Sequence, residues 1–201
     1  MGSCFGKEQS SMSTRSVDDN DVNIWPTKKP NYLAKNLTRS TPLPAWVSRG
    51  MPSNPPEFTP LHKHIVSETW VNLRGSMVSI GMAVFRNLAE ALPPVKELLR
   101  SKNKDKSLME LVLYHGELVM GSVGKAVMYL NDPVQMQNFL HEVGERHAEV
   151  DVRAEYMDCF IPFFIAALRP KLRGKWASNI EDAWAAFFRF IIHFIKEAMI
   201  F

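Results

Sequence analysis

The amino-acid sequence predicts an all-α domain that follows a long tail without regular structure. Apolar residues after Thr59 recur every three or four positions, as one face of an amphipathic helix requires. No run of alternating apolar and polar residues is long enough to predict a strand. Prolines crowd into the first 60 residues, which hold eight of the 13: Pro26, Pro30, Pro42, Pro44, Pro52, Pro55, Pro56 and Pro60.

The predicted tail covers residues 1–58. It is rich in Ser, Thr and Asn, and its apolar residues show no sustained period. Such a segment buries too little surface to offset the entropy lost on ordering, so we expect it to be mostly disordered. Residues 59–201 form the predicted helical domain, whose 201 − 58 = 143 residues suffice for a hydrophobic core.

Two helices are predicted at the start of the domain. Thr59 and Pro60 are typical of an N-cap followed by proline at the first helical position. The apolar face of this helix carries Leu61, Ile65, Thr69, Trp70 and Leu73. A second helix, from about Ser76 to Leu92, ends before Pro93 because proline drives the residue before it out of helical geometry.

Two longer helices follow a polar connector at residues 101–106. Ser107 and Glu110 form a capping box that starts the first of them. Its apolar stripe contains Leu108, Val112, His115, Val119, Val123 and Val127. The next helix starts at Asp132-Pro133, and its face carries Met136, Leu140, Val143 and His147.

The last two predicted helices are the most aromatic. We expect one from Asp151 to about Arg169, distorted at Pro162. Its face carries Phe160, Phe163, Phe164 and Leu168. A second capping box, Ser178 with Glu181, starts the final helix. The apolar face of that helix carries Trp184, Phe187, Phe188, Ile191, Ile195 and Met199.

The composition excludes several classes of protein. With 46% hydrophobic and 22% charged residues, the chain is close to an average soluble globular protein. A net charge of +3 does not indicate a nucleic-acid binder, and two cysteines cannot form a disulfide framework. The apolar run 183–195 is a poor membrane span because Arg189 and His193 interrupt it. No apolar signal-peptide core follows Met1, so we expect the chain on the cytosolic side.

His115 and His147 form a pair on two consecutive predicted helices, each in line with an aliphatic stripe. A lone histidine on an apolar face is most often a hydrogen-bonded core residue. Neutral imidazole is also a common metal ligand, but two are too few for a structural zinc site, and no cysteine is spaced to help. Two imidazoles that face each other across an apolar slot suit a haem iron, whose other four ligands come from the porphyrin.

The whole helical domain, residues 59–201, resembles a globin. The residues that carry the resemblance stand in the family's order: Trp70, Gly81, Pro93, Tyr114-His115-Gly116, the stretch LHEVGERH ending at His147, and Trp184. The separation of 147 − 115 = 32 residues is similar to that in neuroglobin-type globins. The resemblance implies a globin fold around haem b, with His147 as the proximal and His115 as the distal ligand of the iron. It also implies gaseous ligands such as O₂, CO or NO.

The resemblance implies four further pocket residues, Phe85, Leu99, Val119 and Val143. Phe85 and Val119 would make the distal side apolar around His115, and ordinary core packing is the alternative for both. The family expects a phenylalanine stacked on the haem at the position of Leu99. Either leucine replaces the aromatic there, at the cost of the stacking contact, or the register slips near Pro93.

The first residues, Met1-Gly2-Ser3-Cys4-Phe5-Gly6-Lys7, resemble an N-myristoylation start. Removal of Met1 exposes the amine of Gly2 for acylation, although Gly6 stands where Ser or Thr is preferred. Cys4 would then lie beside the bilayer as a palmitate acceptor, since one myristoyl chain holds only weakly. A chance Met-Gly start in a disordered tail is the alternative. The signal predicts a lipid anchor on the cytosolic face of the plasma membrane, with a fraction in the cytoplasm. Together with the resemblance of residues 59–201, the signal indicates a neuroglobin-like or an invertebrate membrane-tethered globin.

Three functions stay open. The first is a membrane-tethered, six-coordinate haem globin in electron transfer or in redox or gas signalling, with an unidentified redox partner. The second is reversible dioxygen transport or storage. The third, from another class, is a haem-free globin-like interaction module, against which the histidine pair argues. The tether favours the first, because attachment raises the local concentration near partners.

The sequence does not decide whether the protein is an enzyme. No Ser/His/Asp triad, phosphate loop or paired-carboxylate site is visible, and a haem redox activity would have no acid–base residue beyond His115. We expect Cys159 to be an inert buried thiol. The acids on the helix before His147 are expected to form a solvated face: Glu142, Glu145 and Glu149.

Overall fold

The computed structural model describes residues 54–101, 104–172 and 174–200. Seven α-helices occupy most of this part of the chain, which contains no β-strand, so the all-α prediction is confirmed. The helices are α1 (Pro60–Leu73), α2 (Met77–Ala91), α3 (Pro93–Ser101), α4 (Leu108–Met128), α5 (Pro133–Glu149), α6 (Glu155–Leu168) and α7 (Ser178–Ile200). Short 3₁₀ turns, Arg74–Ser76 and Arg169–Leu172, follow α1 and α6. Most of the predicted tail 1–58 lies outside the described residues, and the predicted boundary at residue 59 stays a prediction.

Three predicted helix starts are confirmed by their capping bonds. The hydroxyl of Thr59 accepts a bond of 3.2 Å from the amide of His62, whose ring accepts one in return from the Thr59 amide. Ser107 and Glu110 exchange the same pair of bonds at the start of α4. The carboxylate of Asp132 accepts from the amide of Gln135 at 3.0 Å. Each side chain satisfies amides that the first turn of a helix leaves without a partner.

The prediction that Asp151 opens a helix is wrong. Asp151 has a positive φ of 57°, and α6 begins four residues later at Glu155. The amides around Asp151 point back to α5: those of Val150 and Val152 bond the carbonyl of His147. Residues 150–152 therefore close α5 with a left-handed residue, as many helix ends do. Pro162 lies on the exposed side of α6, which continues through it to Leu168.

The second predicted capping box, Ser178 with Glu181, is also wrong. The amides of Ile180 and Glu181 bond the carbonyl of Ala177 at the start of α7. The Glu181 carboxylate accepts instead from the Arg169 guanidinium at 2.7 Å and from the Trp176 indole at 3.2 Å. The Glu181 side chain, which the local pattern predicts in the capping box, therefore binds Arg169 and Trp176 instead.

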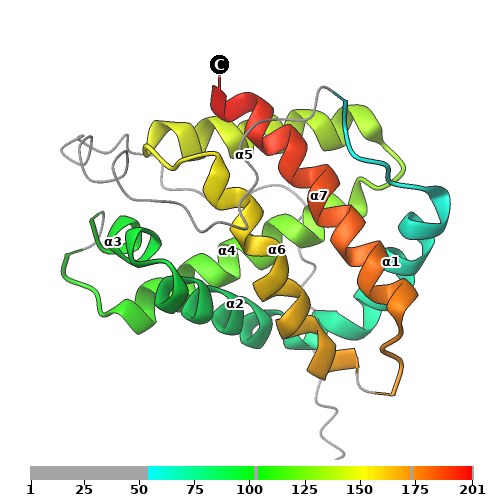
Figure 1. Ribbon diagram of the computed structural model, residues 1–201, viewed down its shortest axis with the longest axis horizontal. Coiled ribbons are helices and arrows are strands. Elements are labelled where there is room, and N and C mark those ends of the chain that lie inside the picture. Colours follow the sequence, from blue (N-terminus) through cyan, green and yellow to red (C-terminus); the bar gives the residue numbers. More distant parts are fainter. Residues whose placement is uncertain (1–53, 102–103, 173, 201) are drawn as a thin grey trace, which may run out of the picture.

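The helices pack as two crossing pairs, α2 with α4 and α5 with α7. In Figure 1, α5 and the C-terminal end of α7 lie at the top, α3 lies at the left, and α6 runs from the centre down to the lower right. At the first crossing, a Cβ on Gly116 would lie 2.7 Å from the backbone carbon of Gly81, so only glycine at both positions allows this approach.

An aromatic cluster on α6 and α7 forms the centre of the core. Phe164 and Phe188 pack with ring centroids 4.1 Å apart, and both are fully buried beside Trp184. The Trp184 indole donates a hydrogen bond of 3.0 Å to the hydroxyl of Thr69, which ties α7 to α1. Leu61 does not belong to the buried face of α1 as predicted, because 63% of it is exposed. Among the described residues, no helix is long and apolar enough to cross a bilayer.

Candidate functional site

A cavity of about 820 Å³ opens between the helices, within the range typical of ligand pockets. All six residues predicted to build the site line it: Phe85, Leu99, His115, Val119, Val143 and His147. They come from α2, α3, α4 and α5, so the fold brings together residues that are far apart in the sequence.

His115 and His147 face each other in this cavity. Their ring centroids lie 6.4 Å apart, and their planes are inclined by 76°. A metal ion lies about 2 Å from the imidazole nitrogen that binds it, so two imidazoles on opposite sides of one ion have centroids roughly 6 Å apart. The two rings therefore have the separation that a shared metal ion requires.

His147 is oriented by its own helix. Its Nδ1 lies 2.7 Å from the carbonyl oxygen of Val143, one turn earlier on α5. Because a carbonyl only accepts, Nδ1 carries the proton and donates it, so the lone pair of the neutral ring lies on Nε2, the form in which imidazole binds a metal. Burial lowers the pKa of His147 and the bond to Val143 opposes this shift, so the ring is neutral at pH 7.

His115 lies against an aromatic wall. The Phe85 ring meets it edge-on, with centroids 4.6 Å apart, and Val119 lies one turn further along α4. Burial first, and the neighbouring His147 second, lower the pKa of His115 to about 3. Both imidazoles are therefore in the neutral form that binds metals.

The remaining walls are apolar, and some of their residues were missed in the sequence. On α3 the lining is aliphatic, with Leu99 beside Val95 and Leu98. Aromatic lining comes instead from Phe160 on α6 and Phe188 on α7, with ring centroids 5.6 Å apart. Tyr156 and Met157 of α6, and Ile191, Ile192 and Ile195 of α7, complete this side. The sequence predicted Phe160, Phe188, Ile191 and Ile195 on apolar helix faces, but it did not predict which cavity these residues would line.

The charged residues that line the cavity all come from α5. Glu142, Glu145 and Glu149 on α5 are exposed, as predicted for a solvated face, and Arg146 lies among them. No cluster of three or more histidine, cysteine or carboxylate side chains in the described part of the chain could hold a metal ion. Metal binding there depends on the histidine pair and on ligands from outside the chain.

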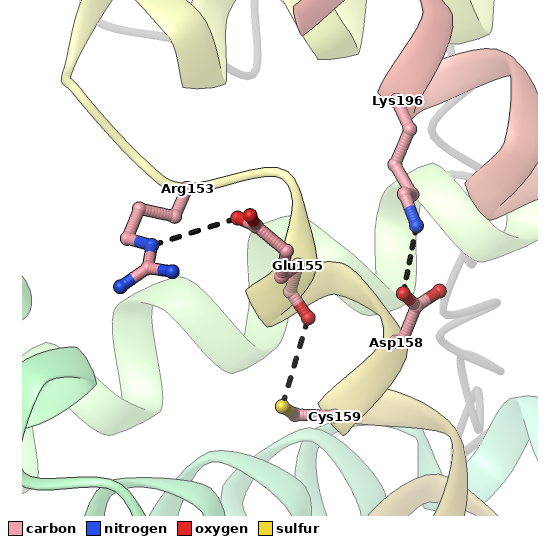
Figure 2. A network of polar contacts seen from close by, with 5 residues as sticks. All are labelled: Arg153, Glu155, Asp158, Cys159 and Lys196. Atoms are coloured by element: carbon pink, nitrogen blue, oxygen red, sulfur yellow. Dashed lines mark hydrogen bonds and ion pairs between the residues drawn. The ribbon is translucent and has the colours of Figure 1, made fainter. Parts of the chain in front are cut away.

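Figure 2 shows a second set of polar contacts, on α6, on α7 and on Arg153 just before α6, and none of its members lines the cavity. The buried ammonium of Lys196 donates to the Asp158 carboxylate at 2.7 Å. Beside it, Cys159 is fully buried and its thiol donates to the Glu155 carbonyl at 3.7 Å. Burial and the charge of Asp158 raise the pKa of Cys159 to about 11, which favours the protonated thiol, and the predicted burial of this cysteine is confirmed.

The site suits a flat, largely apolar group with a metal at its centre. The two neutral imidazoles lie across the cavity from each other and would supply two metal ligands, and most of the other lining residues are apolar. A porphyrin supplies the other four ligands and has a wide apolar face. The residues present therefore fit a haem.

Comparisons with known proteins agree with this architecture. A family model described as globin matches residues 82–195. The chain is 32% identical over 77 residues to a globin, the major polymeric component P1 of Glycera dibranchiata. That match covers 38% of this chain and half of that relative. Neuroglobin of Danio rerio is 22% identical over 135 residues, 65% of this chain and 85% of that protein.

A solved structure resembles the fold as a whole. It is the crystal structure of a hexacoordinated haem protein from an anhydrobiotic tardigrade, with a TM-score of 0.62 and 19% identity. The superposition covers 71% of this chain and 96% of that one. The family model spans more than half of the sequence and includes both histidines. The chain belongs to the globin family.

Proposed function

We propose that this globin binds haem b in the cavity between His147 and His115, and that both histidines would hold its iron. In this proposal the protein serves electron transfer or redox and gas signalling. The observation that carries the proposal is the separation of 6.4 Å between the two imidazole rings across an apolar cavity. A haem-free interaction module would have no use for two neutral imidazoles held in this way.

The two histidines have different roles. His147 is the anchor, because its bond to the Val143 carbonyl fixes the ring and its tautomer. His115 is the exchangeable ligand, held by packing against Phe85. When bound, haem supplies an iron centre that changes oxidation state and accepts small gaseous ligands. The apolar walls keep water away from that centre.

A redox or signalling role is favoured over dioxygen storage by the position of His115. A dioxygen store needs an open binding position on its iron, whereas here a second imidazole lies 6.4 Å from the first across the cavity. Two histidine ligands would keep the surroundings of the iron similar in both oxidation states, which would favour electron transfer. The tardigrade relative is named as hexacoordinated, and this supports the proposal.

Carbon monoxide kinetics test the proposal. In the ferrous wild-type protein, His115 must leave before CO binds, so the observed rate should reach a plateau as CO is increased. In His115→Leu the rate should rise in proportion to CO without a plateau. A wild-type rate that also rises in proportion to CO contradicts the proposal and favours the dioxygen carrier.

We also propose that myristate on Gly2 and palmitate on Cys4 attach the protein to the cytosolic face of the plasma membrane, with a fraction in the cytoplasm. Both residues lie outside the described part of the chain, and the support is the N-terminal sequence. Two acyl chains are required for stable attachment, which is why Cys4 matters. The redox partner would then be found near the same membrane.

A further inference from the structure

Helices α5 and α7 touch through their backbones at Gly144. A Cβ placed on Gly144 would overlap the carbonyl oxygen of Ile195 and would lie 2.9 Å from the Cβ of Ala198. A real Cβ does not approach a backbone oxygen so closely, and the backbone cannot turn aside as a side chain can. Glycine is thus the residue that lets α5 lie this close to α7.

The contact lies on the same turn of α5 that orients His147. Gly144 follows Val143, whose carbonyl accepts the bond from His147, and His147 stands three residues further on. On the other helix, Ile195 also lines the cavity. A change in the distance between α5 and α7 at this point therefore moves the imidazole of His147.

The other histidine has a matching contact. His115 is followed by Gly116, which touches the backbone of Gly81 where α4 crosses α2. Each of the two imidazoles is thus within one helical turn of a glycine that allows backbone contact with a neighbouring helix. The distance between the two imidazole rings therefore depends on where α4 and α5 lie. Each of these helices is held against a neighbouring helix by a glycine contact.

We infer that Gly144 is a positioning residue, which seats α5 on α7 and thereby sets the spacing between His147 and His115. The inference rests on the proposed function, in which both imidazoles bind one iron. A methyl group at residue 144 forces α5 away from α7, and His147 moves with its helix while Gly116 holds His115 in place. One of the two metal bonds then weakens, and the bond to the less firmly oriented His115 is lost first.

The test compares ferrous absorption spectra of haem-loaded wild type, Gly144→Ala and Gly124→Ala. Gly124→Ala is the matched control: it lies on α4, and its Cβ would meet the Trp70 side chain at 3.1 Å, away from the contact of α5 with α7. We expect Gly144→Ala to raise the ratio of five-coordinate to six-coordinate haem by about tenfold or more. Gly124→Ala should leave this ratio at the wild-type value.

Two further variants separate positioning from loss of stability. Gly144→Ala made in a His115→Leu background should change the coordination state no further, because the spacing no longer matters once one imidazole is absent. Ala198→Val adds bulk to the same contact from the side of α7. It should raise the ratio of five-coordinate to six-coordinate haem as well, and it provides a test even if Gly144→Ala does not fold.

The possible failures are distinguishable. A high-spin ferrous wild type refutes the two-histidine proposal itself. A low-spin wild type whose ratio is unchanged in both Gly144→Ala and Ala198→Val refutes the role of Gly144 alone. Equal shifts in Gly144→Ala and Gly124→Ala also refute it, since they would indicate a general loss of stability.

Discussion

His147 and His115 lie in one cavity but differ in what holds them. His147 donates a hydrogen bond to the Val143 carbonyl, whereas His115 rests against the edge of the Phe85 ring. A ligand oriented by a hydrogen bond binds its metal more firmly than one positioned by packing. The anchor role therefore belongs to His147.

Removal of each imidazole tests this difference. We expect His147→Ala to lower haem retention more than His115→Ala, because the remaining His115 lacks the orienting bond. The measurement is the haem-to-protein ratio after desalting, for both variants and the wild type. Equal retention in His147→Ala and the wild type would refute the assignment of His147 as the anchor.

Low pH should lower the free energy of unfolding of the haem-free protein, because His115 and His147 are buried in the neutral form. The pKa of His115 falls from 6.5 to about 3 on folding, so between these values the unfolded chain binds a proton that the folded protein does not. The free energy of unfolding therefore falls as the pH falls below 6.5, by about 1.4 kcal/mol per pH unit for one proton. The lowered pKa of His147 acts in the same direction.

Urea unfolding of the haem-free protein between about pH 8 and about pH 5 measures this dependence. His115→Leu should show a smaller loss of stability on acidification than the wild type, because one buried group that must stay neutral has been removed. Identical pH profiles for the two proteins would contradict the burial of His115 as the cause.

The sequence predicts the two candidate ligand residues but not what positions them. His115 and His147 could be found because each interrupts an aliphatic stripe of helical period. Phe160 and Phe188 were recognised only as apolar, and Gly144 was missed. Their roles depend on which helices cross and where, and the pattern along one helix does not contain that information.

At the scale of elements, local signals predicted helix starts where nothing competes for the side chain. Thr59, Ser107 and Asp132 cap their helices as expected. Ser178 with Glu181 has the same pattern, but Arg169 and Trp176 bind the carboxylate of Glu181 instead. A capping motif depends on only a few neighbouring residues. Side chains from elsewhere in the fold can bind the capping residue instead.

The contact between α6 and α7 leads to a prediction about stability. Lys196 and Asp158 form an ion pair of 2.7 Å in which 7% of the lysine side chain and 27% of the aspartate side chain are exposed. Asp158→Asn leaves a buried ammonium without its counter-charge and should cost about 3 kcal/mol or more. Lys196→Met leaves a carboxylate that reaches water and should cost less.

Chemical unfolding of both variants measures the two losses. The haem spectrum serves as the control, since neither residue lines the cavity and both variants should keep the wild-type coordination state. A greater loss of stability in Lys196→Met than in Asp158→Asn would contradict the argument from burial.

At the scale of the whole molecule, the globin domain and the N-terminal signal make separate contributions. The domain supplies the haem site, and the signal at Gly2 and Cys4 supplies the attachment that we propose. Each buried methylene of an acyl chain contributes about 0.8 kcal/mol, so one chain gives reversible binding and two give stable binding.

Membrane fractionation of the full chain tests the attachment. Gly2→Ala should release the protein completely, because Cys4 is modified only after the first acyl chain has brought it to the bilayer. Cys4→Ala should release it partly, with a reversible fraction left on the membrane. Gly2→Ala protein that stays membrane-bound would place the attachment elsewhere in the chain.

We propose that His115 and His147 bind the same iron in the resting protein. The sharpest test is the absorption spectrum of the full-length, haem-loaded protein, recorded in the ferrous state without added ligand. The separation of 6.4 Å between the two rings predicts a low-spin, six-coordinate spectrum that becomes five-coordinate in His115→Leu. A high-spin, five-coordinate spectrum in the unmodified protein would contradict it.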